Sequence, residues 1–388
     1  MKQSKILLVD DNPDNIYLLE VILQSQSFQT LSAGNGREAI EIVKKGNVDL
    51  ILMDVMMPEM DGFEASRHIR NMNETTHIPI IMMTAKKREL GDVVRGLGEG
   101  ALEYLTKPFE EEELLARVKS MLRIKHLYDD NRALLDKVLK QQKVMEQELK
   151  VAEKVQYAML PTAADFPRFS GRCTVETFYR ATASIGGDYY DFLKYDDNRV
   201  GLLIADVSGH GPSAALIVAM LKTLLISEKD DCPSPGEMMA RLNKKLITMI
   251  PDDHFLTAFY CVLDIEKNML TYSRAGHPSP FLVNGEKPEV RELDSLGSIV
   301  GMFDDAEFGE ATVPVGKGDK IFMYSDGIFE VPGKDGNLYG LQKLKELLSA
   351  NRAKPIRELI ETVIKDVDGF WDGESQRDDV AVVALEFN

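Results

Sequence analysis

The sequence predicts a multidomain protein: an α/β domain with a doubly wound parallel sheet of five strands, a helical linker, and a layered α+β domain. Three observations carry this prediction. Residues 1–124 alternate strand-like and helical patterns, residues 110–159 contain neither Pro nor Gly, and strand-like runs cluster beyond residue 161. We therefore expect domains at residues 1–124 and 161–388, joined by a helical, coiled-coil linker at residues 125–160.

The composition is that of an ordinary globular protein, with 44% hydrophobic and 28% charged residues among 388. The net charge of −17 argues against nucleic acid as a partner. No apolar run has the length that spans a bilayer, and the N-terminus lacks a signal-peptide pattern, so we expect no membrane partner. Cys173, Cys232 and Cys261 are widely spaced, which argues against zinc and disulfides and fits a reducing cytoplasm.

Five strand-like runs organise the first domain. Residues 49–54 form a continuous apolar run between acidic ends, which is typical of a parallel strand covered on both faces. The other runs are residues 5–10, 28–32, 78–85 and 101–105, and helical spacing follows at residues 14–24 and 36–45. A doubly wound sheet places its site at the carboxyl ends of its strands. Asp10, Asp54, Thr84 and Lys107 lie at or just beyond four such ends.

These residue types suit phosphoryl transfer. Asp10, Asp11 and Asp54 would crowd negative charge that a divalent cation can neutralise, after which one carboxylate can accept a phosphoryl group. Lys107 would pair with the phosphoryl oxygens, and the Thr84 hydroxyl could bond to them. The alternative is that acidic residues at strand ends are ordinary loop residues.

The first domain, over residues 4–124, resembles the receiver domain of two-component response regulators. The matching motifs are Val9-Asp10-Asp11, the segment from Met53 to Gly62, Thr84-Ala85 and Leu105-Thr106-Lys107-Pro108. The resemblance implies that Asp54 is the phosphoacceptor, that Thr84 and Tyr104 form a switch pair, and that Lys107-Pro108 is a cis peptide. It also implies a Mg²⁺ held by Asp10, Asp11, Asp54 and the Met56 carbonyl. The implied partner is a cognate sensor histidine kinase or phosphotransfer protein.

The linker has the pattern of a coiled coil. A 3-4 repeat of mostly apolar positions runs from Met121 to Met159 and predicts a helix that pairs with a second copy, giving a homodimer. Asn131, Gln142 and Gln156 interrupt the seam with polar side chains that could fix its register. The alternative is a single amphipathic helix packed on a neighbouring domain. Leu160-Pro161 ends the helix.

The last domain alternates less regularly. Its strand-like runs are residues 174–180, 200–207, 257–264, 269–274, 320–325 and 380–387, and its helical patterns are residues 212–228, 235–249, 341–350 and 355–370. Clustered strands with grouped helices predict an α+β layered domain. Carboxylates follow or precede these runs: Asp188, Asp206, Asp326 and Asp378.

Four such acids could hold two cations, which bind phosphate oxygens and activate water for ester hydrolysis. Taken singly, Asp-Gly pairs are more often turns. Taken in order, five motifs resemble the metal-dependent (PPM, type 2C) serine/threonine phosphatases, in particular the bacterial sporulation and stress-response branch. They are the segments 186–191, 206–211, 275–278, 324–328 and 377–380, in a match that covers residues 150–388.

The resemblance implies two Mn²⁺ or Mg²⁺ ions held by Asp188, Asp206, Asp326, Asp378 and the Val207 carbonyl. Asp379 competes with Asp378 for the last place. The implied substrate is a phosphorylated protein of the anti-sigma-factor antagonist kind. His210 and His277 are better explained by turn packing than by phosphate contact, Trp371 by the core, and Arg180 is a candidate phosphate contact.

Together these expectations describe a response regulator whose phosphorylation on Asp54 controls a metal-dependent protein serine/threonine phosphatase. The alternative is a receiver-gated scaffold that sequesters a phosphoregulated partner without catalysis. The presence of all four expected metal carboxylates favours the enzyme. The sequence does not fix whether phosphorylation raises or lowers the output.

Overall fold

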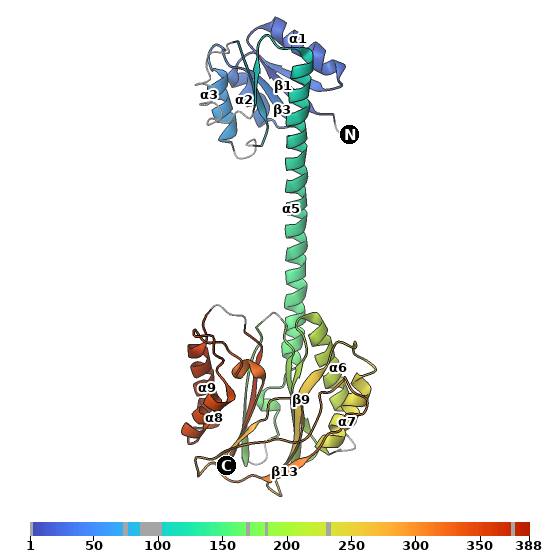
Figure 1. The fold of residues 1–388 in the computed structure, drawn as a ribbon, viewed down its shortest axis with the longest axis vertical. Coiled ribbons are helices and arrows are strands. Elements are labelled where there is room, and N and C mark those ends of the chain that lie inside the picture. The colour runs from blue at the N-terminus through green and yellow to red at the C-terminus, as the bar shows by residue number, and fades with distance from the viewer. Residues whose placement is uncertain are drawn as a thin grey trace. The chain divides into compact units, whose positions relative to one another are not determined.

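The computed structural model describes residues 3–72, 77–85, 103–167, 171–182, 185–229, 234–373 and 377–388. The chain forms two compact units, Met1–Lys143 and Val144–Asn388, which are taken separately below. The predicted fold class is confirmed: a five-stranded parallel sheet, a long helix and a two-sheet sandwich covered by helices (Figure 1). Cys232 and the predicted strand start at residue 101 lie outside the described residues.

The first unit is built on a parallel sheet of strand order β2-β1-β3-β4-β5. The strands are β1 (Lys5–Val9), β2 (Gln29–Ala33), β3 (Leu50–Asp54), β4 (Ile80–Thr84) and β5 (Glu103–Thr106). The described helices are α1 (Pro13–Ser25), α2 (Gly36–Lys44), α3 (Gly62–Arg70) and α5 (Glu111–Met159).

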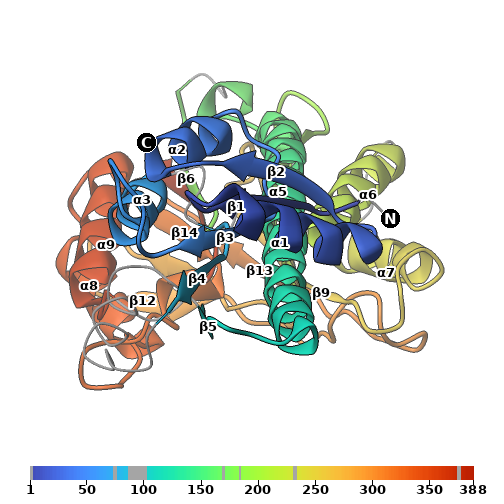
Figure 2. The ribbon, with the colours of Figure 1, turned by 90° about the horizontal axis from the view of Figure 1, so that it is seen from above.

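Both faces of this sheet are covered, as the apolar strands predict. α1 and the first turns of α5 cover one face, where Leu19 and Val118 pack against strand residues. α2 and α3 cover the other face, where Val43 and Ile69 do the same (Figure 2). Each of α1, α2 and α3 begins at an Asn or Asp side chain that accepts a hydrogen bond from its first turn. The capping residues lie in the loops that follow β1, β2 and β3.

α5 is a single helix of 49 residues, as the absence of Pro and Gly predicts. Leu114, Val118 and Met121 are buried in the first unit. Further along, the apolar side chains of Ile124 and Leu135 are 49% and 57% exposed. Among the described helices, none combines the length with the apolar composition that crossing a lipid bilayer requires.

The second unit is an αββα sandwich of two antiparallel sheets. One sheet has the order β13-β10-β9-β8-β7, with β7 (Asp188–Lys194), β8 (Arg199–Val207), β9 (Leu256–Asp264), β10 (Met269–Ala275) and β13 (Ala311–Pro314). The other has the order β12-β11-β14-β15-β6, with β6 (Cys173–Arg180), β11 (Phe281–Val283), β12 (Val290–Glu292), β14 (Lys320–Tyr324) and β15 (Val380–Phe387).

Side-chain alternation explains the layers. On β8, Leu202 and Ile204 pack between the two sheets, whereas Leu203 and Ala205 face α6 (Pro212–Glu228) and α7 (Pro235–Leu246). On β15, residues alternate in the same way between the sandwich interior and α8 (Leu341–Ala350) with α9 (Ile356–Phe370). Figure 1 shows the two helix pairs on opposite sides of the sheets. Two buried faces per sheet make the strand ends rigid supports for a site.

The sequence did not predict β7, β11, β12 or β13. β7 carries Asp188 and Asp191 among its aromatic residues, and both acids are buried, so its sequence lacks the polar and apolar alternation of a half-exposed strand. β11, β12 and β13 are too short to show a period. The helix predicted to reach Met249 ends at Leu246 instead.

Candidate functional site

The first unit brings three of its predicted site residues into direct contact. The Lys107 ammonium lies 2.7 Å from Asp10 Oδ2 and 2.5 Å from Asp54 Oδ1. Asp10 follows β1, Asp54 ends β3 and Lys107 follows β5, so the parallel sheet places all three at one edge. Both carboxylates are buried, at 1% and 8% exposure. Although burial opposes it, the two carboxylates raise the pKa of Lys107, which stays charged.

A second set of contacts orients these carboxylates. Asn15 on α1 donates to both oxygens of Asp10, at 3.0 and 3.1 Å, and the Asn12 backbone donates to Oδ1 at 3.0 Å. The Met56 backbone N–H donates to Asp54 Oδ2 at 2.9 Å. Sequence reasoning missed Asn15, because its role depends on which face α1 turns to the sheet.

Asp11, Met56 and Thr84 lie at the same edge, whereas Tyr104 lies two residues before the end of β5. Asp11 is exposed next to Asp10, and the Met56 side chain is 78% exposed. Thr84 ends β4, where its carbonyl accepts a 2.7 Å hydrogen bond from the Lys107 backbone. The Lys107-Pro108 peptide is cis, as predicted. Tyr104 lies half-buried on β5.

The second unit contains a cavity of about 670 Å³ at the ends of its strands. The residues that line it come from segments nearly two hundred positions apart: Thr182, Gly187, Asp206, Gly209, His210, Glu330, Arg377, Asp378 and Asp379. Asp188 is paired with Asp206 across β7 and β8, so these two predicted ligands are neighbours. Asp326 opens a short 3₁₀ turn directly after β14.

Two glycines allow the acidic segments to approach each other. A Cβ on Gly187 would lie 2.5 Å from the Val207 carbonyl oxygen and 3.1 Å from Asp206 Oδ1, so both oxygens face the same point. A Cβ on Gly327 would lie 1.9 Å from the Asp379 carbonyl oxygen, which only glycine tolerates. Gly327 thereby holds Asp326 beside the Asp378-Asp379 segment.

The electrostatics show how crowded these acids are. Burial, together with the charges of Asp326 and Asp378, raises the pKa of Asp206 to about 8. Burial and Asp378 raise the pKa of Asp326 to about 6. Burial and Asp206 raise the pKa of Asp188 well above its usual value, and the Ser325 hydroxyl offsets this only in part. Such shifts mark carboxylates that lack a counter-charge.

This donor set fits divalent cations. Asp188 Oδ2 is fully buried and has no hydrogen-bond partner, which is costly for a carboxylate oxygen unless a ligand meets it. Carboxylate and carbonyl oxygens are the ligands that Mg²⁺ and Mn²⁺ prefer. Within the described residues, no three His, Cys, Asp or Glu side chains are grouped tightly enough to form a ready-made cage. Mutual repulsion keeps carboxylates apart until a cation neutralises them.

Asp378 and Asp379 are in different situations. Asp379 is buried, and its two oxygens accept backbone hydrogen bonds from Thr182 at 2.7 Å and Gly187 at 2.8 Å. Asp378 is exposed in the cavity, and one of its oxygens accepts a 2.8 Å bond from the Asp379 backbone. Asp379 therefore ties the loop after β6 to β15, while Asp378 keeps an oxygen for a ligand.

The structure shows the surroundings of three side chains whose part in phosphate contact the sequence did not decide. His277 is fully buried beside the Thr257 hydroxyl at 2.9 Å, and burial lowers its pKa to about 3, which agrees with a packing role. His210 is exposed in the cavity wall. Both terminal nitrogens of Arg180 bond to Asp368, at 3.1 and 2.9 Å, so its side chain is already engaged.

The last turn of α5 reaches this site through Gln156, which is 3% exposed. Its side-chain amide donates to the Gly186 carbonyl at 2.6 Å and accepts from the Gly186 N–H at 3.1 Å. Two residues later comes Asp188. Sequence reasoning placed Gln156 in the coiled-coil seam; the structure corrects this, because its amide satisfies a buried peptide instead.

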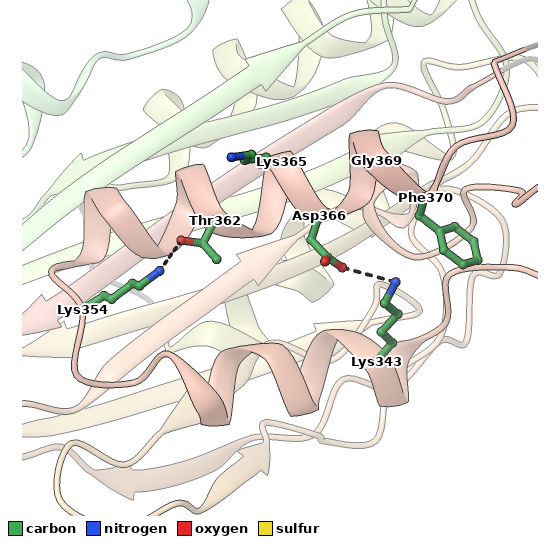
Figure 3. Close-up of a pocket in the computed structure, with 7 residues that line it drawn as sticks. All are labelled: Lys343, Lys354, Thr362, Lys365, Asp366, Gly369 and Phe370. Atoms are coloured by element: carbon green, nitrogen blue, oxygen red, sulfur yellow. Dashed lines mark hydrogen bonds and ion pairs between the residues drawn. The ribbon is translucent and has the colours of Figure 1, made fainter.

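A further cavity, of about 550 Å³, lies between α8 and α9 and contains no carboxylate cluster (Figure 3). Lys343 lies 3.3 Å from Asp366, and Lys354 donates to the Thr362 hydroxyl at 2.9 Å. Each of these two lysines is therefore engaged within the fold, and we assign no chemistry to this cavity.

Comparison with known proteins agrees with this division. Residues 6–119 match the response regulator receiver domain, and residues 196–388 match the model of stage II sporulation protein E (SpoIIE). Protein PilH of Pseudomonas aeruginosa is 40% identical over 119 residues, which cover 31% of this chain and 98% of PilH. Phosphoserine phosphatase RsbP of Bacillus subtilis (strain 168) is 27% identical over 243 residues, which cover 62% of this chain and 57% of RsbP.

Among solved structures, the SiaA-PP2C domain of Pseudomonas aeruginosa aligns with a TM-score of 0.57 at 20% identity, covering 64% of this chain and 99% of that domain. At this identity the likeness shows a shared fold. The sandwich with its strand-end cavity is therefore the PP2C fold. The chain belongs to the response regulators, with a receiver domain at residues 6–119 and a SpoIIE (PPM-type) phosphatase domain at residues 196–388.

Proposed function

We propose that the protein is a metal-dependent protein serine/threonine phosphatase whose output is set by its receiver. The observation that carries this proposal is the strand-end cavity, where buried acids repel one another and Asp188 Oδ2 has no partner. Two Mn²⁺ or Mg²⁺ ions would be held there by Asp188, Asp206, Asp326, Asp378 and the Val207 carbonyl. When bound, such ions neutralise the phosphoryl group and supply a nucleophile from water at neutral pH.

The chain's own residues perform the remaining work. Gly187 lets a phosphate approach the backbone closely, because it carries no side chain in the cavity wall. Asp379 fixes the loop that bears Gly187 through its backbone hydrogen bonds. We assign Asp378 rather than Asp379 as the ligand, since both oxygens of Asp379 already accept hydrogen bonds. The ester is thus positioned by a rigid frame.

We propose that Asp54 accepts a phosphoryl group from a cognate sensor histidine kinase or phosphotransfer protein. Mg²⁺ would be held by Asp10, Asp11, Asp54 and the Met56 carbonyl. Lys107 is charged and in contact with Asp54, so it can follow the phosphoryl oxygens, and the Thr84 hydroxyl would bond to them. The phosphorylated state would then be read by the switch pair of Thr84 and Tyr104.

We propose that α5 carries this signal. It begins at Glu111 in the first unit, and its last turn carries Gln156, whose amide bonds to Gly186, two residues before Asp188. A rotation or shift of the helix would move this peptide and alter metal binding. An allosteric coupling of about 1–3 kcal/mol corresponds to a 5- to 150-fold change in the affinity of the coupled site for its ligand. We propose that residues 1–124 and 161–388 are the two domains and that residues 125–160 are the helical linker between them.

The exposed apolar side chains of the middle of α5 support a homodimer through the linker. Tyr128, Leu135 and Met145, three positions of the predicted seam, are 50%, 57% and 61% exposed in the single chain. A second copy of the helix would cover such side chains in a coiled coil. The similarity to RsbP, a phosphoserine phosphatase, supports the substrate class that we propose, which is a phosphorylated protein of the anti-sigma-factor antagonist kind.

The test is manganese-dependent release of phosphate from an aryl phosphate and from phosphorylated candidate regulators, with and without beryllofluoride on Asp54. We expect activity in the wild type and none in Asp326→Asn. The competing function is a receiver-gated scaffold that sequesters its partner without catalysis. It predicts that Asp326→Asn binds the phosphorylated regulator as the wild type does and that neither protein releases phosphate.

A further inference from the structure

The cavity that holds the acids contains one permanent positive charge among the described residues that line it, Arg377. It directly precedes Asp378, so its backbone is tied to the same segment that we assign to metal binding. The other charged side chains of the wall are acidic: Asp206, Asp378, Asp379 and Glu330.

The Arg377 guanidinium is held from two directions. Its Nη1 donates to Asp368 Oδ1 at 2.7 Å, and its central carbon lies 5.2 Å from the centre of the Trp371 ring. The side chain is only 12% exposed. Asp368 in turn accepts hydrogen bonds from both terminal nitrogens of Arg180. Although burial opposes it, these two arginines lower the pKa of Asp368, so the acid stays charged and fixes Arg377.

The second terminal nitrogen of this guanidinium makes no hydrogen bond. Nη2 of Arg377 is buried and has no hydrogen-bond partner. The guanidinium is planar, so holding Nη1 on Asp368 also fixes the direction of Nη2. A buried charged donor without an acceptor is costly, and an arginine fork matches the oxygens of a phosphate.

We propose that Arg377 binds the phosphoryl group of the substrate through Nη2, an inference that rests on the proposed phosphatase activity of this cavity. Asp368 and Arg180 act as positioning residues, because they hold the guanidinium and do not meet the substrate. The phosphate contact that the sequence suggested for Arg180 is thus assigned to Arg377. In this arrangement the phosphate would be bound by this arginine together with cations held by the acids of the same cavity.

The experiment compares full-length wild type, Arg377→Gln and Arg377→Lys, each loaded with Mn²⁺. Loss of one hydrogen bond to a charged group predicts that Arg377→Gln raises the KM for an aryl phosphate and the inhibition constant of inorganic phosphate about 10- to 100-fold. The change in kcat is smaller than the change in KM. Arg377→Lys keeps the positive charge but loses the forked guanidinium, so its KM and inhibition constant should lie between those of the wild type and Arg377→Gln.

Arg357→Gln is the matched control. Arg357 lies near the start of α9, is 75% exposed and pairs with Glu361 across 3.7 Å. Its substitution therefore removes the same charge from a residue that does not line the cavity. Its phosphate inhibition should equal that of the wild type. Circular dichroism reports whether each variant folds, and if Arg377→Gln does not, the Lys variant carries the test through its KM.

Binding of inorganic phosphate to the Mn²⁺-loaded proteins, measured by calorimetry, separates this inference from the proposed function. Should the wild type bind phosphate without releasing it from any ester, the phosphatase proposal fails while weaker binding by Arg377→Gln still supports Arg377. Equal phosphate affinity in the wild type and a folded Arg377→Gln, or wild-type KM and inhibition values in that variant, overturns the inference.

Discussion

The crowded acids of the second unit predict that the metal-free protein loses stability between about pH 4 and about pH 8. Burial and the charges of Asp326 and Asp378 raise the pKa of Asp206 to about 8 in the folded protein. In the unfolded chain the same carboxyl group titrates near its usual value of about 4. The folded state therefore binds this proton more tightly. The stability that this adds is complete below about pH 4 and is lost as the pH rises through about 8.

The size of the effect follows from the two pKa values. Each pKa unit between them is worth about 1.4 kcal/mol, which sets an upper limit of about 6 kcal/mol for Asp206. Asp188 and Asp326 have raised pKa values as well, so the acids titrate as a group and share this loss. Mn²⁺ should remove the loss, because it replaces the protons with a cation. Its stabilising effect should therefore grow as the pH rises.

The assay uses the single tryptophan of the sequence. Trp371 lies beside Arg377 in the second unit, so its fluorescence reports on that unit alone. Urea unfolding of the full chain is followed across this pH range, once with a chelator and once with Mn²⁺. We expect the chelator midpoint to fall with rising pH in the wild type. In Asp206→Asn the fall is much smaller, and Mn²⁺ raises the midpoint less.

The control is Asp197→Asn, which removes the same charge from a side chain that is 97% exposed. Its pH profile should match the wild type. A chelator profile that is flat or rises with pH would refute the crowding argument. A profile that Asp197→Asn flattens as much as Asp206→Asn does would attribute the effect to net charge instead.

Three further predictions concern single contacts. Gln156→Ala leaves both groups of a buried peptide unpaired, so it should destabilise the second unit by about 2–4 kcal/mol and lower manganese affinity, as measured by urea unfolding and metal titration. Lys107→Ala removes the counter-charge of Asp54 and should cost about 1–3 kcal/mol in receiver thermal unfolding, while labelling of Asp54 by an acyl phosphate no longer changes the phosphatase rate. Asp378→Asn should weaken manganese binding with little effect on stability. Asp379→Asn should lower the stability by about 1–3 kcal/mol, because an amide cannot accept hydrogen bonds from both backbone donors. The reverse pattern would show that Asp379 is the ligand and Asp378 the structural residue.

The receiver site was the part most readable from the sequence. In a parallel sheet every strand ends at the same edge, so residues that follow strands must meet there. Asp10, Asp54 and Lys107 do so, in direct contact. Asn15 could not be predicted, because the face that α1 turns toward Asp10 depends on tertiary packing.

The acidic residues of the phosphatase site could be predicted from the sequence, but the strand pairing that brings them together could not. Asp188 and Asp206 are neighbours only because β7 and β8 pair in one register, and β7 was not predicted as a strand. Antiparallel register is set by turns and by cross-strand packing, which short-range patterns do not encode. The same limit hid Arg377, whose position depends on Asp368 at the end of α9.

The two sites solve the same electrostatic problem in different ways. In the receiver, Lys107 is a counter-charge within the chain and satisfies Asp10 and Asp54 without a metal. In the phosphatase cavity no described Lys or Arg forms an ion pair with Asp188 or Asp206, and their raised pKa values record the deficit. The first site is thus stable before its ligand arrives, which suits a switch that must persist in its resting state. Under the function we propose, the second would depend on its cations for stability as well as for chemistry, and a contact that shifts the Gly186 peptide would then control metal occupancy.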